Sequence, residues 1–271
     1  MKTFSLSSFW LQGAALRSLF AALQKEGEAR VVGGAVRNTL LGQPLGDIDV
    51  ATDLPPERVA RAAKRADFSV YETGLAHGTL TIVVDGQPFE VTTLREDVAT
   101  DGRRATVRFT TDWALDAQRR DFTMNALYVD ADGNGSDYVN GHADCLEGRV
   151  RFIGNADTRI AEDHLRILRF FRFHALYGEG EPDADGLASV VANKALIEDL
   201  AAERVLHELT RLLAAERAAP VVEIVAREGI LAPFIDHPIS IGGYRAICAA
   251  ERAAGRPLNA TLSLLSIVDF D

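Results

Sequence analysis

The chain has 271 residues, and its 47% hydrophobic and 25% charged content is typical of a folded globular protein, neither disordered nor membrane-spanning. The net charge of −10 gives no overall basic footprint for a nucleic-acid partner, but holding one nucleic-acid end needs only local basicity, so such a partner is not excluded. The two cysteines, Cys145 and Cys248, lie far apart and form no CxxC pair. They favour a reducing compartment, and the cytoplasm is the default expectation.

Periodic patterns predict a helix near the N-terminus and strands after it. Apolar residues recur there at helical spacing and predict an amphipathic helix; they are Leu16, Leu19, Phe20 and Leu23. Short β-branched runs then alternate with turns and predict strands at 30–32, 48–52, 79–84, 89–94 and 126–129. Asp85 and Gly86 lie between two of these runs and are typical of a two-residue hairpin turn.

The pattern of the sequence changes near residue 155, from alternating strand-like runs to helical periodicity. After it, successive amphipathic helices are expected, interrupted at 178–186 and near Pro220, Pro233 and Pro238. The sequence therefore predicts an α+β fold with two domains, in which residues 1–154 form a mixed sheet with flanking helices and residues 155–271 are all-α.

A candidate phosphate-binding turn lies near the start of the sheet region. A short strand ends at Gly33 and Gly34, and a helix opens at about Ala35 and ends near Gly42. Two adjacent glycines let the backbone approach a ligand closely, and a helix N-terminus directs free amide hydrogens at it. Most glycine pairs are simple turns, however, and Arg37 taken alone is equally compatible with a solvated surface position.

Two carboxylates follow in the sequence GDIDV. In a strand, Asp47 and Asp49 project to the same face while Ile48 and Val50 face the core. The two carboxylates repel, which is explained if they share magnesium ions, because magnesium is commonly held by one or two carboxylates and substrate phosphates. Two such ions about 3.5–4 Å apart can activate an attacking hydroxyl and stabilise a leaving pyrophosphate oxygen. An isolated DxD is more often a solvated strand end, but the order of glycine turn, helix and DxD strand favours a metal site.

Four segments resemble, in order, the signatures of one enzyme family. They are GGAVRNTLLGQPLGDIDVAT, RRDFTMNALYVD from Arg119, IAEDHLRILRFFRF from Ile160, and ERVLHEL from Glu203. Over about residues 31–213 they resemble the class II family of CCA-adding tRNA nucleotidyltransferases and bacterial poly(A) polymerases. The resemblance implies a polymerase β-type nucleotidyltransferase head followed by a helical neck and part of a body. The reaction it implies is template-independent transfer of CMP and AMP from CTP and ATP to the 3′ end of tRNA, with Mg2+ held by Asp47 and Asp49.

Further residues are candidates for the same site. The hairpin places Glu90 beside the core sheet, where it is a candidate third carboxylate, although an edge glutamate facing water is an equal alternative. A buried Asn125 needs hydrogen-bond partners, so it is either a structural tie or a ligand contact. The resemblance implies that Asn125 and Arg120 contact the ribose and triphosphate, with Asp121 orienting the arginines.

Base selection is expected on the helix that contains EDHLRILRFF. Asp163 and Arg166 are three residues apart, hence neighbours on one helical face, which by itself indicates only a salt bridge. The resemblance aligns them with the residues that read the base of the incoming nucleotide. A carboxylate and a guanidinium match the amine donor and ring-nitrogen acceptor that cytosine and adenine share. A later helix is expected to hold the neck through four charged residues: Glu203, Arg204, Glu208 and Arg211.

Several features bear on which family activity to expect. The family usually has Asp where this chain has Asn38, and it usually continues past residue 271 through more helices that grip tRNA, so the helical domain is expected to be incomplete. CCA addition is favoured because AHGTLTIVVDGQPFEVTTLR looks like the CCA-adding type and lacks the basic stretch typical of bacterial poly(A) polymerases. The alternatives are AMP addition to RNA 3′ ends and a non-catalytic RNA-binding relative. Residues 96–111, with Arg103, Arg104 and Arg108, are expected to form a mobile loop near the site.

Overall fold

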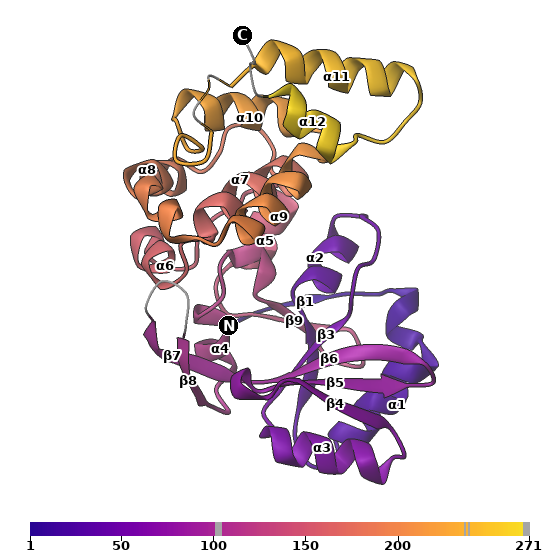
Figure 1. Cartoon of the computed structure of the whole chain (residues 1–271). Coiled ribbons are helices and arrows are strands. Elements are labelled where there is room, and N and C mark those ends of the chain that lie inside the picture. Colours follow the sequence, from indigo (N-terminus) through magenta and orange to yellow (C-terminus); the bar gives the residue numbers. More distant parts are fainter. Residues whose placement is uncertain (101–104, 236, 238, 268–271) are drawn as a thin grey trace. The chain divides into compact units, whose positions relative to one another are not determined.

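The computed structural model describes residues 1–100, 105–235, 237 and 239–267 and divides into two compact units. The first comprises residues 1–100 and 105–147, and the second begins at Gly148 (Figure 1). The sequence places this boundary slightly later, after residue 154. Each unit is described by itself below.

The first unit is built on an eight-stranded mixed sheet with the order β1-β10-β9-β2-β3-β6-β5-β4 (Figure 1). The pairing of β3 with β6 is parallel, and the other pairings in this sheet are antiparallel. The strands are β1 (Lys2–Ser5), β2 (Ala29–Val32), β3 (Asp49–Thr52), β4 (Ser69–Gly74), β5 (Thr79–Val84), β6 (Gln87–Thr93), β9 (Leu127–Val129) and β10 (Asn134–Asp137).

The helices of this unit are α1 (Ala14–Leu23), α2 (Gly34–Leu40), α3 (Pro56–Arg65), α4 (Trp113–Gln118) and α5 (Gly141–Leu146). Short 3-10 turns are η1 (Phe9–Gln12), η2 (Leu75–His77) and η3 (Thr123–Asn125). The predicted N-terminal amphipathic helix is confirmed, since its apolar positions are buried in α1; they are Leu16, Leu19, Phe20 and Leu23. Helices α1 and α3 pack against each other and against β5 (Figure 1).

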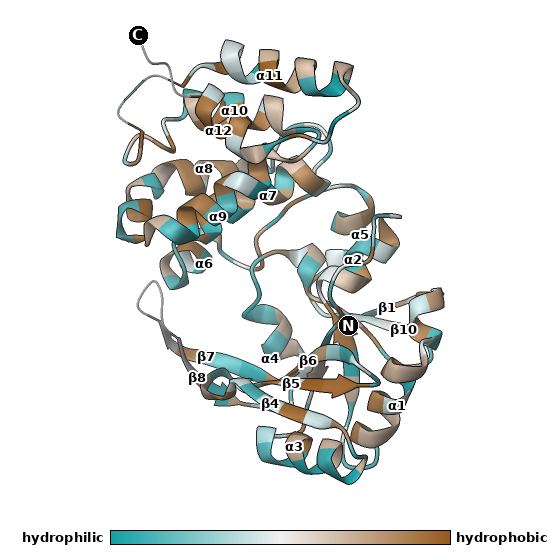
Figure 2. Cartoon of the chain, turned by 45° about the vertical axis from the view of Figure 1, so that its right-hand side comes forward, coloured by the Kyte–Doolittle hydropathy of each residue, from teal (hydrophilic) through white to brown (hydrophobic). Residues whose placement is uncertain are grey.

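The predicted strands and hairpin are confirmed in the centre of the sheet. Asp85 and Gly86 have φ values of 50° and 79°, and they join β5 to β6 with Val84 opposite Gln87. Two positive φ values are what a tight two-residue hairpin turn requires. Figure 2 shows β5 as a largely hydrophobic strand, and its alternate residues Leu80 and Ile82 are buried.

The expectation of a mobile loop at 96–111 is wrong for its described residues. Two strands, β7 (Arg95–Thr100) and β8 (Ala105–Phe109), form a separate antiparallel two-stranded sheet. The cross-strand ion pair between Arg108 Nε and Glu96 Oε1 measures 2.7 Å. Opposite charges face each other across the pair at Glu96 and Arg108, and both segments contain β-branched residues, which suits a strand pair despite the polar composition. Arg103 and Arg104 lie outside the described residues.

The second unit is helical, as predicted. Its helices are α6 (Ala156–Glu162), α7 (Arg166–Tyr177), α8 (Ala184–Ala192), α9 (Ala202–Leu213), α10 (Ala218–Arg227), α11 (Ile241–Ala253) and α12 (Ala260–Ser266), with the 3-10 segment η4 (Lys194–Asp199). Helix α7 packs against α9 and α10 and buries Phe170 and Phe171 (Figure 1). The chain leaves α7 at Gly178, so the predicted interruption is confirmed.

The expectation of one continuous helix through Glu162, Asp163 and Arg166 is wrong. Helix α6 ends at Glu162, Asp163 is extended with φ −151° and ψ 105°, and α7 begins at Arg166. The Asp163 carboxylate accepts a 3.2 Å hydrogen bond from the amide of Leu165. Such local side-chain bonds to the backbone compete with the helical pattern, and here the bond lies at the break between the two helices.

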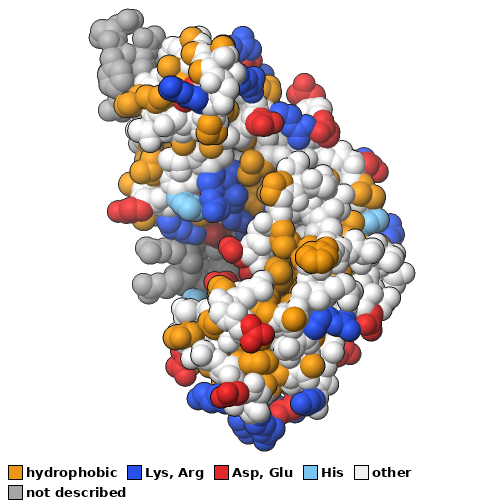
Figure 3. Space-filling model, turned by 90° about the vertical axis from the view of Figure 1, so that its right-hand side faces the viewer, with side chains coloured by type: hydrophobic (Ala, Val, Ile, Leu, Met, Phe, Trp, Pro, Cys, Tyr) orange, Lys and Arg blue, Asp and Glu red, His pale blue; other side chains and the backbone are white. Residues whose placement is uncertain are grey.

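Within the described residues, no helix combines the length and apolar character that crossing a bilayer would require. Figure 3 shows one face of the molecule, where Lys and Arg side chains gather in several places among acidic ones. The net charge of −10 is thus compatible with local basicity.

Candidate active site

Two of the three predicted carboxylates, Asp49 and Glu90, lie side by side in the sheet, and Asp47 lies close enough to affect the charge of Asp49. Asp49 opens β3, and its register partner on the parallel strand β6 is Glu90. Neighbouring strands lie about 4.7–4.9 Å apart, and register partners project to the same face. Burial raises the pKa of Asp49 to about 6, and the nearby Glu90 and Asp47 carboxylates contribute to the increase. The site therefore concentrates negative charge where a cation would be stabilised.

Asp47 lies in a different local structure from the one expected. It was predicted to share a strand with Asp49, but the strand begins at Asp49, and Asp47 is an exposed residue of the preceding loop. Val32 pairs with Asp49 at the end of β2, and the chain then turns away at Gly33, so within the described residues the pairing of β3 with β2 stops at Asp49 and does not reach Asp47. Ile48 and Val50 are buried as predicted.

The glycine turn and helix α2 have the predicted form. Gly33 has φ 78° and ψ −123°, a left-handed backbone region that favours glycine, and it forms the N-cap of α2. At the other end, Gly42 has φ 64°, and the amides of Gly42 and Gln43 donate to the carbonyls of Thr39 and Asn38. This is the paired hydrogen-bond pattern by which glycine commonly ends a helix.

Arg37 is buried rather than solvated, with 6% of its surface exposed. Its Nε and Nη2 atoms donate to Asn38 Oδ1 at 3.1 and 2.8 Å, and its Nη1 donates to Asn125 Oδ1. The Asn125 amide in turn donates to Asp121 Oδ1 at 3.0 Å. The structure thus brings the predicted residues Arg37, Asn125 and Asp121 into one buried network.

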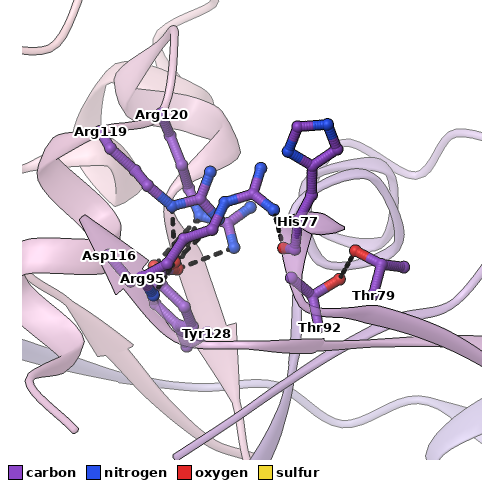
Figure 4. Close-up of polar contacts among 8 residues, drawn as sticks. All are labelled: His77, Thr79, Thr92, Arg95, Asp116, Arg119, Arg120 and Tyr128. Atoms are coloured by element: carbon purple, nitrogen blue, oxygen red, sulfur yellow. Dashed lines mark hydrogen bonds and ion pairs between the residues drawn. The ribbon is translucent and has the colours of Figure 1, made fainter. Parts of the chain in front are cut away.

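Asp116 is a site residue that the sequence analysis missed. It is 1% exposed and accepts hydrogen bonds from Arg119 Nε at 2.8 Å, Arg120 Nη2 at 2.9 Å and the Tyr128 hydroxyl at 2.8 Å (Figure 4). Burial alone would raise the pKa of Asp116, but Arg120 and Arg119 overcome this effect and hold the pKa well below its usual range. The sequence did carry a signal, because Arg119 and Arg120 follow Asp116 at the i+3 and i+4 spacing of helical neighbours.

Arg95 joins the same group of guanidinium side chains (Figure 4). Burial, followed by the charge of Arg119, lowers the pKa of Arg95 to about 10. Its Nη1 donates to the carbonyl of His77, whereas its Nε is buried and has no hydrogen-bond partner among the described residues. The sequence analysis did not single out Arg95.

Arg120 links the arginines to the carboxylates. Its positive charge lowers the pKa of Asp49 and so opposes the effects of burial and of Glu90. A cationic group and an anionic group therefore lie within electrostatic reach of each other, as a site for a metal-bound phosphate requires. Among the described residues, no cluster of three or more His, Cys, Asp or Glu has metal-binding geometry. Magnesium does not require one, since substrate phosphates and water commonly complete its coordination.

The predicted base-reading residues lie in the second unit. Arg204 Nη2, from α9, donates to both carboxylate oxygens of Asp163 at 3.1 and 3.3 Å. Arg166 Nη1 donates to Glu162 Oε2 at 2.6 Å and to the carbonyl of Arg159 at 2.9 Å. Both residues are thus held by neighbours from defined helices.

The helical network is confirmed for two of its four members. Glu208, which is 3% exposed, accepts a hydrogen bond from Arg172 Nε, and Arg204 binds Asp163. Glu203 and Arg211 are exposed residues of α9.

Comparisons with known proteins match both units. Residues 29–151 match the model of the poly A polymerase head domain, and residues 182–238 match a model described as "Probable RNA and SrmB- binding site of polymerase A". The mitochondrial CCA tRNA nucleotidyltransferase 1 of Mus musculus is 37% identical over 261 residues, which are 94% of this chain and 60% of that protein. The CCA-adding enzyme of Oceanobacillus iheyensis is 38% identical over 200 residues, which are 73% of this chain and 49% of that enzyme.

A solved structure gives the same result for the fold. The crystal structure of the Bacillus stearothermophilus CCA-adding enzyme in complex with CTP has a TM-score of 0.74 and 31% identity, over 90% of this chain and 57% of that chain. The first unit is a polymerase β-type nucleotidyltransferase head. The chain spans about half to six tenths of the length of these relatives. Its sequence signatures, both family models and these relatives agree: the chain belongs to the class II family of CCA-adding tRNA nucleotidyltransferases and bacterial poly(A) polymerases.

Proposed function

We propose that this chain transfers CMP and AMP from CTP and ATP to the 3′ end of tRNA without a nucleic-acid template. The observation that carries the proposal is the pairing of Asp49 with Glu90, with Asp47 and Arg120 within electrostatic reach. The names of the relatives support the choice of reaction, since they are CCA tRNA nucleotidyltransferase 1 and CCA-adding enzyme.

The carboxylates suit magnesium. Asp49 and Glu90 are adjacent oxygen donors, and the mutual repulsion that contributes to the raised pKa of Asp49 would be relieved by a hard cation. Asp47 and Asp49 would hold the ions, and Glu90 would act as the third carboxylate. When bound, two ions about 3.5–4 Å apart supply charge stabilisation to both the attacking and the leaving oxygen.

The other residues of the head would bind and orient the nucleotide. The backbone at Gly33 and Gly34 would approach the triphosphate. Arg37 and Asn125, which are joined by a hydrogen bond, would contact the same group. Arg120, held by Asp116 and by the Tyr128 hydroxyl, would neutralise phosphate charge. Correct placement of the reacting groups is a large part of catalysis in phosphoryl-type transfer.

Base selection would be the task of Asp163 and Arg166. A carboxylate fixed by Arg204 accepts from an exocyclic amine, and a guanidinium fixed by Glu162 donates to a ring nitrogen. Cytosine and adenine can hydrogen-bond to both residues. Guanine and uracil instead present a ring N–H donor beside a carbonyl, which does not match this pair.

The proposal is tested with purified protein, magnesium, labelled CTP or ATP, and a tRNA that ends before its CCA sequence. The expected result is addition of CCA followed by termination. Open-ended AMP addition from ATP alone would instead identify the chain as a poly(A) polymerase. Binding of RNA without any transfer would identify a non-catalytic relative. The Asp49→Asn variant serves as the matched inactive control.

A further inference from the structure

Asn38 lies between two groups with opposite hydrogen-bonding needs. Its Oδ1 accepts from Arg37 Nε at 3.1 Å and from Nη2 at 2.8 Å. Its Nδ2 donates to the carbonyl oxygen of Pro44 at 2.8 Å. The half-buried side chain therefore joins the buried arginine of α2 to the loop that leads to Asp47.

An amide satisfies both partners, whereas an ionised carboxylate cannot. A guanidinium has donors and no acceptor, and a backbone carbonyl has an acceptor and no donor, so the bridging group must accept on one side and donate on the other. An ionised aspartate, which the family usually has here, would bind Arg37 but would place an acceptor oxygen against the Pro44 carbonyl. Asn in place of Asp at position 38 therefore changes which groups the side chain can hydrogen-bond.

The loop that Asn38 holds is exposed to solvent. Residues 42–47 are all exposed, and the amides of Gly42 and Gln43 are bonded to the end of α2. The Asn38 amide reaches into this exposed segment and donates a hydrogen bond to the Pro44 carbonyl. Asp47 follows three residues after Pro44, so its position depends on how firmly this segment is held.

The connection continues on the other side of the arginine. Arg37 Nη1 donates to Asn125 Oδ1, and Asn125 Nδ2 donates to Asp121 Oδ1 at 3.0 Å. Asn38 and Asn125 therefore use the same chemistry, each accepting from Arg37 and donating onward. The result is a continuous chain of hydrogen bonds from Asp121 to the loop before Asp47.

We propose that Asn38 is a positioning residue that couples the nucleotide-binding arginine to the loop carrying Asp47. The inference rests on the proposed function only for the roles of Arg37 and Asp47. The coupling itself is a property of the folded chain and is measurable without catalysis.

The test compares Asn38→Asp and Asn38→Ala with the control Gln43→Glu. The control adds the same charge as Asn38→Asp to the same exposed region, and Gln43 holds the helix end through its backbone amide alone among the described contacts. Hydrogen–deuterium exchange is measured for the peptide that spans residues 41–48. Both Asn38 variants are expected to exchange faster there by about threefold to tenfold, the usual effect of one lost hydrogen bond, while Gln43→Glu exchanges like wild type.

A kinetic measurement separates positioning from simple support of the fold. For Asn38→Asp, the magnesium concentration that gives half-maximal transfer is expected to rise about threefold to tenfold, with the nucleotide KM unchanged because Arg37 is still held. For Asn38→Ala, the magnesium concentration for half-maximal transfer and the nucleotide KM are both expected to rise, because the hydrogen bonds to Arg37 and to the Pro44 carbonyl are both lost. A purely structural residue would lower the melting temperature without this split.

Wild-type loop exchange and wild-type magnesium dependence in Asn38→Asp would overturn the inference. Inactive wild-type protein whose loop exchange still responds to the Asn38 variants would instead refute the proposed function and leave the coupling in place. The two failures are therefore distinguishable.

Discussion

Asp49 and Glu90 are register partners on adjacent parallel strands, and their mutual repulsion contributes to a pKa of about 6 for Asp49. The two residues are far apart in sequence and meet only because β6 returns beside β3. Burial and the neighbouring negative charges both disfavour ionised Asp49. Ionised Asp49 therefore destabilises the metal-free protein, and a bound cation would remove this destabilisation. This relationship leads to the first two predictions.

Replacing either DxD carboxylate is expected to abolish nucleotide transfer while leaving the fold intact. Asp47→Ala and Asp49→Ala each remove an oxygen ligand without opening a core cavity. The transfer rate should fall by more than about a hundredfold, because even residues that only support metal ligands commonly contribute 10–100-fold. Single-turnover assays measure the rate and circular dichroism the fold. Glu72→Ala, at an exposed position of the edge strand β4, is the control and should transfer normally. Near wild-type transfer in either DxD variant would remove that residue from the mechanism.

The magnesium-free protein is expected to lose stability as the pH rises through about 6, because of Asp49. The pKa of Asp49 in the folded protein lies above the ordinary aspartate value of 3.8, so its contribution to stability is fully present below pH 3.8 and is lost as the pH rises through the folded-state pKa. Asp49→Asn removes the titrating group. Its melting temperature should exceed that of wild type at pH 8, and this difference should shrink at pH 5. Equal differences at both pH values would show that Asp49 is ionised throughout this range.

Asp116→Asn is expected to destabilise the head strongly, because it leaves Arg119 and Arg120 without their buried counter-charge. Removing one member of a buried ion pair typically costs about 3–5 kcal/mol. Urea unfolding gives the free energy of unfolding. The matched control is Tyr128→Phe, which removes one hydrogen bond to the same carboxylate and should cost only about 1 kcal/mol. Similar losses in the two variants would mean that the carboxylate charge contributes little.

Nucleotide selectivity is expected to depend on Asp163 and Arg166. Asp163→Ala and Arg166→Ala should reduce the use of CTP and ATP and narrow the preference over UTP and GTP. An unpaired polar group in a water-excluding site costs about 1–3 kcal/mol, or roughly fivefold to more than a hundredfold. Competition between labelled nucleotides measures the preference.

Arg204→Met provides a structural test of the same assignment. It removes the anchor of the Asp163 carboxylate and keeps the carboxylate itself. A partial loss of selectivity is expected, smaller than in Asp163→Ala. Unchanged selectivity in all three variants, with only a loss of stability, would show that these residues support the neck and do not read the base.

Local sequence patterns predicted several elements of this fold. Alternating β-branched runs predicted β2, β5, β6 and β9, and helical spacing of apolar residues predicted α1. The turn at Asp85 and Gly86 and the helix end at Gly42 followed from residues that adopt positive φ at low cost. These features depend on neighbours a few residues apart, so one sequence suffices to find them. The DxD carboxylates also followed from the local pattern of glycine turn, helix and strand, and the resemblance added the base-reading role of Asp163 and Arg166.

The tertiary structure decided what each candidate contacts. Asp163 binds Arg204 and lies at a break between helices. Asp116, which is absent from the predicted site, is almost fully buried and accepts a hydrogen bond from the Tyr128 hydroxyl. The sequence likewise gives the identity of Asn38, but only the structure shows that its side chain bridges Arg37 and the Pro44 carbonyl. Hydrogen bonds and desolvation depend on which distant segments pack together. Spacing along the chain determines the secondary structure, whereas burial and partnership in space determine the charge and orientation of each side chain.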